Sequence, residues 1–490
     1  MSAHSNDGRV ESRPNVVVFV MDTTRALDTV PADADVSPTR AALADEGTEY
    51  GQAFSAAPWT LPSHGSLFTG TYPSKHRANG DRTRLDRELP TVAELFGDAG
   101  YETVGVSNNV WITEEFGFSR GFETFHAREG SWRDRETLGD LLRNPSGSDG
   151  PGFSFTEALS GCLSRDSEAE RDKGAERSIE WVREWLQTRN RTRPFFLFVN
   201  CIEPHLEYRP PEAYAERFLP EGWSYEEAMA IPQGPREFDV GEFDLSTEEL
   251  AVLRRLYRAE IAYMDDQLGT VVDALEATGE RDETVMAVTS DHGENIGEHG
   301  FLGHQYSLYD TVLHVPLVLS GGRFDDDAVT GERMVQTLDL APTLLDAAGI
   351  EAPDAREEFQ GRSFHPSADT DPRSKAFAEY AAPRPPIEKL EERFDEIPER
   401  IYDLQRSIKA VRTETHKYVR CSDGDEELYE VAADPGETTD ISGEATERAS
   451  DLEASLDSWL ASFEQTERTE TETVSVEQST EQRLADLGYL

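Results

Sequence analysis

The stretch Asn15–Arg25 reads NVVVFVMDTTR, in which six consecutive apolar residues end at an aspartate, Asp22. The apolar run is too short and too rich in β-branched residues for a buried helix, so it predicts a strand covered on both faces of a sheet. Four further runs of this kind occur along the chain, at Val104–Val106, Phe195–Val199, Val285–Thr289 and Val315–Leu319.

The segments between these predicted strands have helical periodicity. The predicted helices are Thr91–Ala99, Ala175–Leu186, Thr247–Thr278 and Leu338–Ala348. Strands that alternate with helices predict an α/β fold with a large mixed, mostly parallel central sheet flanked by helices. Farther along, short strand-like pieces predict a small antiparallel sheet, at Lys409–Arg412, Lys417–Cys421 and Glu427–Val431. A last helix is expected at about Glu444–Phe463.

This pattern predicts a polar N-terminal extension at 1–14 and a main α/β domain at 15–375. Residues 128–167 are rich in Gly, Ser, Asp and Arg and are interpreted as an insertion or lid. An α+β subdomain is expected at 376–440, followed at 441–490 by the last helix and an acidic tail.

The chain is strongly acidic, with 97 Asp and Glu residues against 47 Lys and Arg, a formal net charge of −50. So negative a surface repels phosphates, which argues against general binding to nucleic acid or anionic membranes. Only six of the cations are lysines. Together these features favour adaptation to molar salt, where screening removes much of the self-repulsion. The alternative is an acidic protein that works at ordinary salt.

Three well-separated cysteines form neither a disulfide framework nor a metal motif. The N-terminus lacks an apolar signal core, and no apolar run approaches the ~20 residues of a membrane helix. We therefore expect a cytoplasmic protein without membrane insertion, with export by an unrecognised route as the alternative.

Polar residues follow three of the predicted strands. Asp22 follows the first, His205 follows the strand at Phe195–Val199, and Asp291 and His292 follow Val285–Thr289. Ligands of open α/β sheets bind beyond the carboxyl ends of the strands. Either aspartate alone is also typical of a helix N-cap or a turn. Together with the histidine, however, they form a set suited to Zn²⁺, Mn²⁺, Mg²⁺ or Ca²⁺.

The segment Ala57–Gly70, APWTLPSHGSLFTG, predicts a helix with Pro62 in its first turn and Gly70 at its end. Thr60 then lies just before the helix N-terminus, a position that favours an anion. Thr60 could simply be an N-cap. If its oxygen also met a metal, it would be an activated nucleophile.

Several motifs, taken in order, resemble the sulfatase family of the alkaline phosphatase superfamily. They are NVVVFVMDTTR at 15–25, TLPSHGSLFTGTYP at 60–73, EPH at 203–205, TSDHGENIGEHG at 289–300, YDTVLHVPL at 309–317 and the segment 411–435. The resemblance covers roughly residues 15 to 440 and implies a catalytic α/β domain at 15–375.

The resemblance also implies roles for individual residues. It makes Asp22, Asp291 and His292 metal ligands, and Thr60 a nucleophile that also touches the metal. Two further histidines, His205 and His304, match positions that bind the anionic head of the substrate or protonate the leaving group. Two substrate-binding positions differ in residue type: Asn108 stands where many members have a lysine, and His64 where the signature has an arginine.

The nucleophile position also departs from the family pattern. Family members usually carry there a Cys or Ser that is oxidised to formylglycine, and Thr60 cannot become that aldehyde. Thr23 replaces the second aspartate of calcium sulfatases. The set instead resembles the single-metal threonine enzymes of the superfamily, which transfer phosphoethanolamine or phosphoglycerol. A Thr adduct must be resolved by attack at sulfur or phosphorus, a route better precedented for phosphoryl groups.

The leading hypothesis is a hydrolase that cleaves a sulfate or phosphate ester through Thr60 with one divalent ion (Ca, Mn, Zn or Mg) and no formylglycine. Its substrate would be a small anionic ester, a sulfated or phosphorylated sugar or aryl compound. One alternative is a phosphodiesterase or phospho-group transferase of the same superfamily. The other is a catalytically degenerate protein that binds an anion or glycan.

Overall fold

A computed structural model describes residues 13–31, 35–80, 82–127, 173–326 and 329–463 of the chain. The predicted insertion at 128–167, the tail from residue 464 and most of the N-terminal extension lie outside the described residues. The chain forms a seven-stranded mixed sheet and a four-stranded antiparallel sheet, which confirms the predicted fold class. The domain boundaries stay predictions.

The central sheet is mixed and mostly parallel. Its strands, in spatial order, are β2 (Gly47–Glu49), β10 (Leu317–Ser320), β7 (Thr284–Thr289), β1 (Asn15–Met21), β6 (Phe195–Cys201), β4 (Glu102–Ser107) and β5 (Thr124–Ala127). Strand β10 is antiparallel to both of its neighbours, and the other pairings are parallel. The carboxyl ends of β1, β4, β6 and β7 therefore meet at one edge of the sheet.

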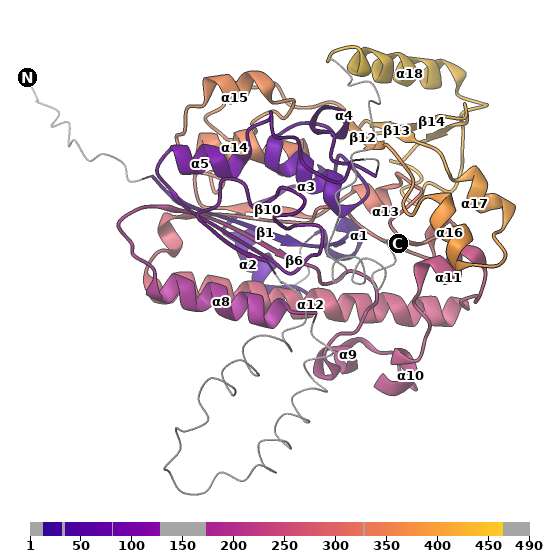
Figure 1. Cartoon of the computed structure of the whole chain (residues 1–490), viewed down its shortest axis with the longest axis horizontal. Coiled ribbons are helices and arrows are strands. Elements are labelled where there is room, and N and C mark those ends of the chain that lie inside the picture. Colours follow the sequence, from indigo (N-terminus) through magenta and orange to yellow (C-terminus); the bar gives the residue numbers. More distant parts are fainter. Residues whose placement is uncertain (1–12, 32–34, 81, 128–172, 327–328, 464–490) are drawn as a thin grey trace, which may run out of the picture.

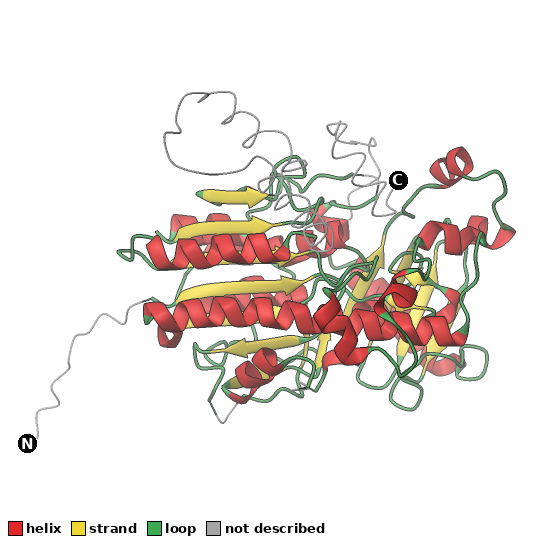
Figure 2. Ribbon diagram, turned by 90° about the horizontal axis from the view of Figure 1, so that it is seen from below, coloured by secondary structure: helices red, strands yellow, loops and turns green. Residues whose placement is uncertain are grey.

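Alternate residues of β1 face two hydrophobic cores, which is why the strand is apolar throughout. One set packs with α3 (Thr60–Thr69), α5 (Val92–Asp98) and α14 (Leu340–Ala347). The other set packs with α2 (Pro38–Asp45), α8 (Ala175–Thr188) and α12 (Thr247–Thr278). Figure 1 shows α3, α5 and α14 on one side of the sheet and α8 and α12 on the other, and Figure 2 looks through α8 and α12 onto the strands.

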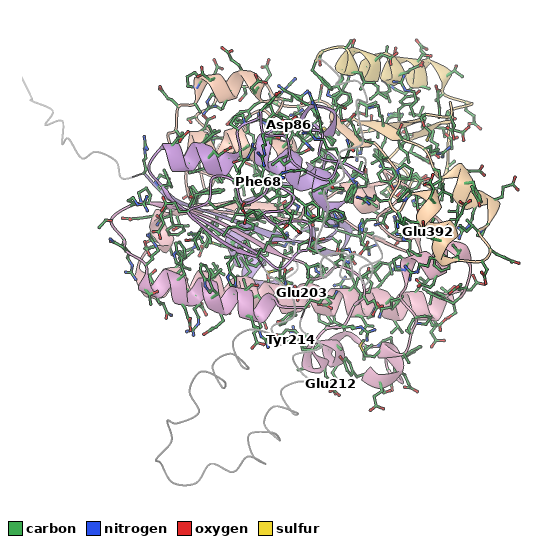
Figure 3. All side chains as sticks on the ribbon, viewed as in Figure 1. Phe68, Asp86, Glu203, Glu212, Tyr214 and Glu392 are labelled. Carbon is green, nitrogen blue, oxygen red and sulfur yellow. The ribbon has the colours of Figure 1, made fainter. Side chains whose placement is uncertain are left out.

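The structure begins helix α3 at Thr60, with Trp59 as the N-cap, so the prediction that Thr60 precedes the helix is wrong by one residue. Pro62 occupies the third helical position, where the missing N–H has no partner inside a helix. The helix ends as predicted at Gly70, whose φ of 62° is in the left-handed region. Phe68, labelled in Figure 3, packs from α3 against Phe198 of β6 at a centroid distance of 4.9 Å.

Helix α12 is the longest described, and its predicted ends are confirmed. A capping box of Ser246 and Glu249 starts it, and Gly279 ends it. The predicted helix Leu338–Ala348 instead begins as a 3₁₀ turn, because Asp339 accepts a hydrogen bond from the amide of Gln336 and tightens the chain there. In the described ranges, no helix combines the length and the apolar character needed to cross a membrane.

The other helices are short: α1 (Ala26–Thr29), α4 (Pro73–His76), α9 (Glu212–Phe218), α10 (Tyr225–Met229), α11 (Pro235–Val240), α13 (Asp310–Leu313), α15 (Pro353–Glu358), α16 (Ile387–Arg393) and α17 (Glu399–Asp403). The 3₁₀ turns are η1 (Arg281–Glu283), η2 (Glu298–Gly300) and η3 (Thr337–Asp339). Two small sheets pair β3 (Gln52–Phe54) with β11 (Met334–Gln336) and β8 (Asn295–Ile296) with β9 (Leu302–Gly303).

The C-terminal sheet is fully antiparallel. Its strands, in order, are β12 (Ala376–Tyr380), β13 (Ile408–Arg412), β14 (Lys417–Cys421) and β15 (Glu426–Tyr429). Helix α18 (Thr446–Leu460) packs on it through an apolar cluster that includes Leu456 and Trp459. The sequence pattern missed β12, because AFAEY is short and lies about thirty residues before its partner β13.

His76 gives the fold a measurable dependence on pH. It is fully buried against Gly65 of α3, with Nε2 3.0 Å from Ser66 Oγ, and burial lowers its pKa to about 3. The unfolded chain binds a proton below pH 6.5, whereas the folded chain does not until about pH 3. The stabilisation of the fold that comes from keeping His76 neutral is therefore complete above pH 6.5. It falls by about 1.4 kcal/mol for each pH unit between pH 6.5 and about 3.

We expect the variant His76→Gln to lower the slope of the unfolding free energy against pH between about pH 3 and 6.5, by an amount equivalent to at most one proton. The slope would be measured by urea denaturation at several pH values. His416→Gln, at a half-buried position of the C-terminal sheet, should change that slope less. An unchanged slope in His76→Gln would contradict the assignment.

Candidate active site

The predicted ligands come together where the parallel strands end. Asp22 follows β1, Asp291 and His292 follow β7, and His205 follows β6. All four side chains are buried. Parallel strands bring residues far apart in sequence to one edge, as open α/β sheets do at their ligand sites.

Asp22, Asp291 and His292 form a group whose potential ligand atoms all lie within 4.8 Å of one another. His292 Nε2 is 3.5 Å from Asp291 Oδ2 and 3.8 Å from Asp22 Oδ1. Oxygen Oδ1 of Asp22 accepts no hydrogen bond from any residue that the structure describes. A buried carboxylate oxygen in that state is expected where a cation belongs.

The electrostatics of the buried carboxylates also favour a bound cation. Burial raises the pKa of Asp22 well above its usual range, and the charge of Asp291 adds to the rise. Burial also acts to raise the pKa of Asp291, but the imidazoles of His292 and His64 outweigh it and hold that pKa below its usual range. Two carboxylates buried this closely are costly without a cation. Two carboxylates and an imidazole therefore fit one divalent metal ion.

Thr60 places its hydroxyl beside this group. As the first residue of α3 it is fully buried, with Oγ1 3.4 Å from His292 Nε2. The unpaired amides of the first turn of α3 and the helix dipole favour negative charge at this position. The Thr60 hydroxyl therefore lies beside the candidate metal-binding group and at the N-terminus of a helix.

The two predicted substrate-binding residues are already engaged within the protein. His64, at the position of the signature arginine, has Nδ1 3.0 Å from the carbonyl oxygen of Thr60 and 3.3 Å from Asp291 Oδ2. The amide of Asn108 donates to Glu203 Oε2 at 3.0 Å and accepts from the backbone N–H of Ile202 at 2.7 Å. His64 Nε2, by contrast, is buried and has no hydrogen-bond partner among the described residues, and the role of both residues in substrate binding stays a prediction.

His205 and His304 lie next to each other beside the predicted ligands. Their ring centroids are 5.1 Å apart, and those of His292 and His304 are 4.4 Å apart. His205 Nδ1 is 2.5 Å from the carbonyl oxygen of Leu206, so we assign the ring proton to Nδ1. Burial lowers the pKa of His205 to about 3, so its ring is neutral at pH 7.

Both ring nitrogens of His304 have partners. Nδ1 is 2.7 Å from Glu294 Oε1, and Nε2 is 2.9 Å from the amide nitrogen of Gln305. Arg236 donates to the amide oxygen of Gln305, which fixes the orientation of that amide. His304 is therefore held with its proton on Nδ1, and burial lowers its pKa well below the usual range.

Residues outside the site hold the loops of the predicted metal ligands in place. Tyr257 of α12 donates to the carbonyl oxygen of Thr23 at 2.7 Å and accepts from the amide of Arg25 at 2.8 Å. Thr23 has a φ of 59°, an unusual value for a β-branched residue. Glycine is required at position 293, because a Cβ there would lie 2.2 Å from the carbonyl oxygen of Thr311.

Three residues of the site escaped the sequence analysis. Asn109 donates to Asp22 Oδ2 at 2.5 Å, Glu294 binds His304, and Lys173 donates to the carbonyl oxygen of His205. Asn109 directly follows the predicted Asn108, and Glu294 lies within the motif at 289–300, so a closer inspection of the polar residues there could have found both. No pattern in the sequence marks Lys173.

Comparisons with known proteins match most of the chain. The family model described as Sulfatase matches residues 14–350, and the model described as N-sulphoglucosamine sulphohydrolase, C-terminal, matches residues 297–466. The choline-sulfatase of Rhizobium meliloti (strain 1021) is 26% identical over 451 residues, covering 88% of this chain and 82% of that protein. Arylsulfatase K of Bos taurus is 25% identical over 480 residues, covering 90% and 81%.

The crystal structure of the phosphonate monoester hydrolase of Agrobacterium radiobacter aligns with 92% of this chain and 95% of that chain. The TM-score is 0.67 at 22% identity, which shows that the two proteins share a fold.

We expect the variants Asp291→Asn and His292→Ala to bind a divalent cation at least about 100-fold more weakly than the wild type, because each removes a ligand. Metal-free protein would be titrated with Mn²⁺ by calorimetry, and the bound metal counted by mass spectrometry. Asp244→Asn, at an exposed position, is the matched control. Wild-type affinity in both ligand variants would exclude this group as the metal site.

Proposed function

The chain belongs to the sulfatase family, and from this premise we propose that it hydrolyses a sulfate or phosphate ester with Thr60 as the nucleophile. Its relatives make it a sulfuric ester hydrolase-like enzyme. The observation that carries the proposal is the place of the Thr60 hydroxyl, buried at the start of α3 and 3.4 Å from His292 Nε2.

Asp22, Asp291 and His292, with the hydroxyl of Thr60, would hold one divalent cation. Such a cation supplies positive charge that favours the deprotonated hydroxyl and neutralises the oxygens of the ester. The identity of the ion stays open among Ca, Mn, Zn and Mg, because the donor set suits all four.

The reaction has two steps. In the first, Thr60 Oγ gives up its proton and forms a bond to sulfur or phosphorus while the ester bond to the organic group breaks, and that proton passes to the departing oxygen. In the second, water attacks the same sulfur or phosphorus, the bond to Thr60 Oγ breaks, Thr60 takes a proton back from the water, and free sulfate or phosphate is released. Formylglycine is not expected, because threonine cannot be oxidised to that aldehyde, so the adduct has no internal exit. Attack by water at phosphorus is the better precedented second step.

We assign His205 to the proton that moves to the departing oxygen. Its ring proton lies on Nδ1, facing the carbonyl oxygen of Leu206, so the lone pair of Nε2 would accept the Thr60 proton and pass it to the departing oxygen. His304 contributes differently, because Gln305 and Glu294 hold both of its nitrogens. Contact between His304 and the ester would require the amide of Gln305 to turn away. Asn108 and His64 stay proposed substrate-binding residues, and both also have hydrogen bonds within the protein.

The proposed substrate is a small anionic ester, a sulfated or phosphorylated sugar or aryl compound. A phosphodiesterase or phospho-group transferase is the second candidate, and the observation that favours it is the threonine itself. The third, a degenerate binder of an anion or glycan, would keep the metal and the anion but show no turnover.

Replacing the nucleophile should separate these candidates. We expect Thr60→Ala to lower turnover of an aryl sulfate or aryl phosphate at least about 10³-fold, and Thr60→Ser to retain part of it. Thr188→Ala, at an exposed position of α8, is the control. Mass spectrometry of the Thr60 peptide after quenched turnover should show an added sulfuryl or phosphoryl group.

Full activity in Thr60→Ala would exclude Thr60 as the nucleophile. Turnover of a bis-aryl phosphate in preference to both monoesters would favour the phosphodiesterase. No turnover of any ester by the metal-loaded wild type would leave the binding protein.

We further propose that the net charge of −50 is an adaptation to molar salt, supported by the six lysines among 47 cations. Turnover and the unfolding midpoint should therefore rise between about 0.1 M and about 2 M KCl, because screening relieves repulsion among the carboxylates. Undiminished activity in dilute buffer would contradict the proposal.

A further inference from the structure

Lys173 lies at the active edge of the sheet although it precedes a helix that covers one face. It comes directly before Gly174, the N-cap of α8. Its ammonium donates a hydrogen bond to the carbonyl oxygen of His205, in the loop after β6. Lysine is uncommon in this chain, with six against 41 arginines, so a lysine at this point is a specific feature of the site.

The backbone around Lys173 is fixed by the same side chains that shape the site. The amide of Asn108 is 3.5 Å from the carbonyl oxygen of Lys173 and also donates to Glu203 Oε2. The other carboxylate oxygen of Glu203 accepts from the backbone N–H of Ala175 at 3.3 Å. Residues 173–175 are thus clamped onto the ends of β4 and β6. Asn108, the predicted substrate-binding residue, thus also contacts the segment that carries Lys173.

The charge of Lys173 is felt inside the site. Burial and the charge of Asp291 raise the pKa of Asp22, and the ammonium of Lys173 opposes them. For His205, burial is the main cause of the low pKa, and Lys173 lowers that pKa further. Lys173 therefore acts electrostatically on a predicted metal ligand and on the histidine assigned to proton transfer.

The buried arginines near the site are committed elsewhere. Arg25 pairs with Asp28 and Glu298, and Arg236 pairs with Asp239. Lysine differs from arginine in carrying a compact charge on a flexible stem, so its ammonium can move by a few ångströms. The ammonium has three donors, so it can contact an anion while it keeps its hydrogen bond to the carbonyl oxygen of His205.

We propose that Lys173 is a substrate-binding residue whose ammonium contacts the anionic oxygens of the ester. The inference rests on the proposed function and adds a residue to that site. Lys173, in the segment before α8, would supply the positive charge that the family resemblance places at position 108, where this chain has asparagine.

Three substitutions separate this role from a structural one. Lys173→Met removes both the charge and the hydrogen bond, Lys173→Gln keeps a donor for the His205 carbonyl oxygen, and Lys173→Arg keeps the charge. Lys389→Met, at an exposed position of α16, is the matched control. The full chain loaded with Mn²⁺ would be titrated with inorganic sulfate and with orthophosphate by calorimetry, and KM would be measured for an aryl sulfate and an aryl phosphate.

We expect the Met and Gln variants to bind the inorganic anion about 10- to 100-fold more weakly, with KM raised by a similar factor, because each loses a charge-assisted hydrogen bond. The Arg variant should stay within a few-fold of the wild type. Mn²⁺ affinity should be unchanged or higher in the Met and Gln variants, because a positive charge near Asp22 has been removed. A damaged site would instead weaken both anion and metal binding.

Wild-type anion affinity in Lys173→Gln would overturn the inference, because Lys173 would then only hold the His205 loop. Equal loss of anion and Mn²⁺ binding would overturn it too. If Lys173→Met does not fold, judged by its thermal midpoint, the comparison of Gln with Arg decides. A wild type that turns over no ester would refute the proposed function, whereas the anion titrations would still decide the role of Lys173.

Discussion

Two carboxylates, those of Asp22 and Asp291, are buried side by side where strands β1 and β7 end. Removing two negative charges from water at one point is costly, and the groups around them are arranged to offset that cost. His292 and His64 lie within 3.5 Å of Asp291 Oδ2, and Asn109 donates to Asp22. One oxygen of Asp22 has no hydrogen-bond partner among the described residues, and this is where a cation would complete the balance.

The position of Thr60, the proposed nucleophile, depends on packing at some distance from its hydroxyl. Helix α3 holds Thr60 at the site because Phe68, two turns farther along, packs on Phe198 of the sheet. The ring of His64 also packs on Phe198, at a centroid distance of 5.9 Å. The ligand loops are held in turn by Tyr257 of α12 on the other face. Packing in the cores on both faces of the sheet therefore positions the residues of the site.

The negative charge of the chain opposes binding of the proposed anionic substrate. A net charge of −50 repels a sulfate or phosphate ester at long range. In the proposed site, binding would then rely on positive charge within a few ångströms: a cation, the amides at the start of α3 and the ammonium of Lys173. High salt would weaken the long-range repulsion more than these short contacts, because screening acts over about a Debye length.

The alternation of strands and helices, the mixed sheet and the residues that end its strands could all be predicted from the sequence. Local patterns suffice for these features, because apolar runs, caps and turn residues act on their neighbours. The nearness of Asp22 to Asp291, 269 positions apart, follows from the parallel order β7-β1-β6 once that order is known. The contacts of Asn108, Glu294 and Lys173 could be seen only in the folded chain, because each depends on a partner brought close by the fold. Asn108 anchors a segment 65 residues away, a contact to which local sequence is blind.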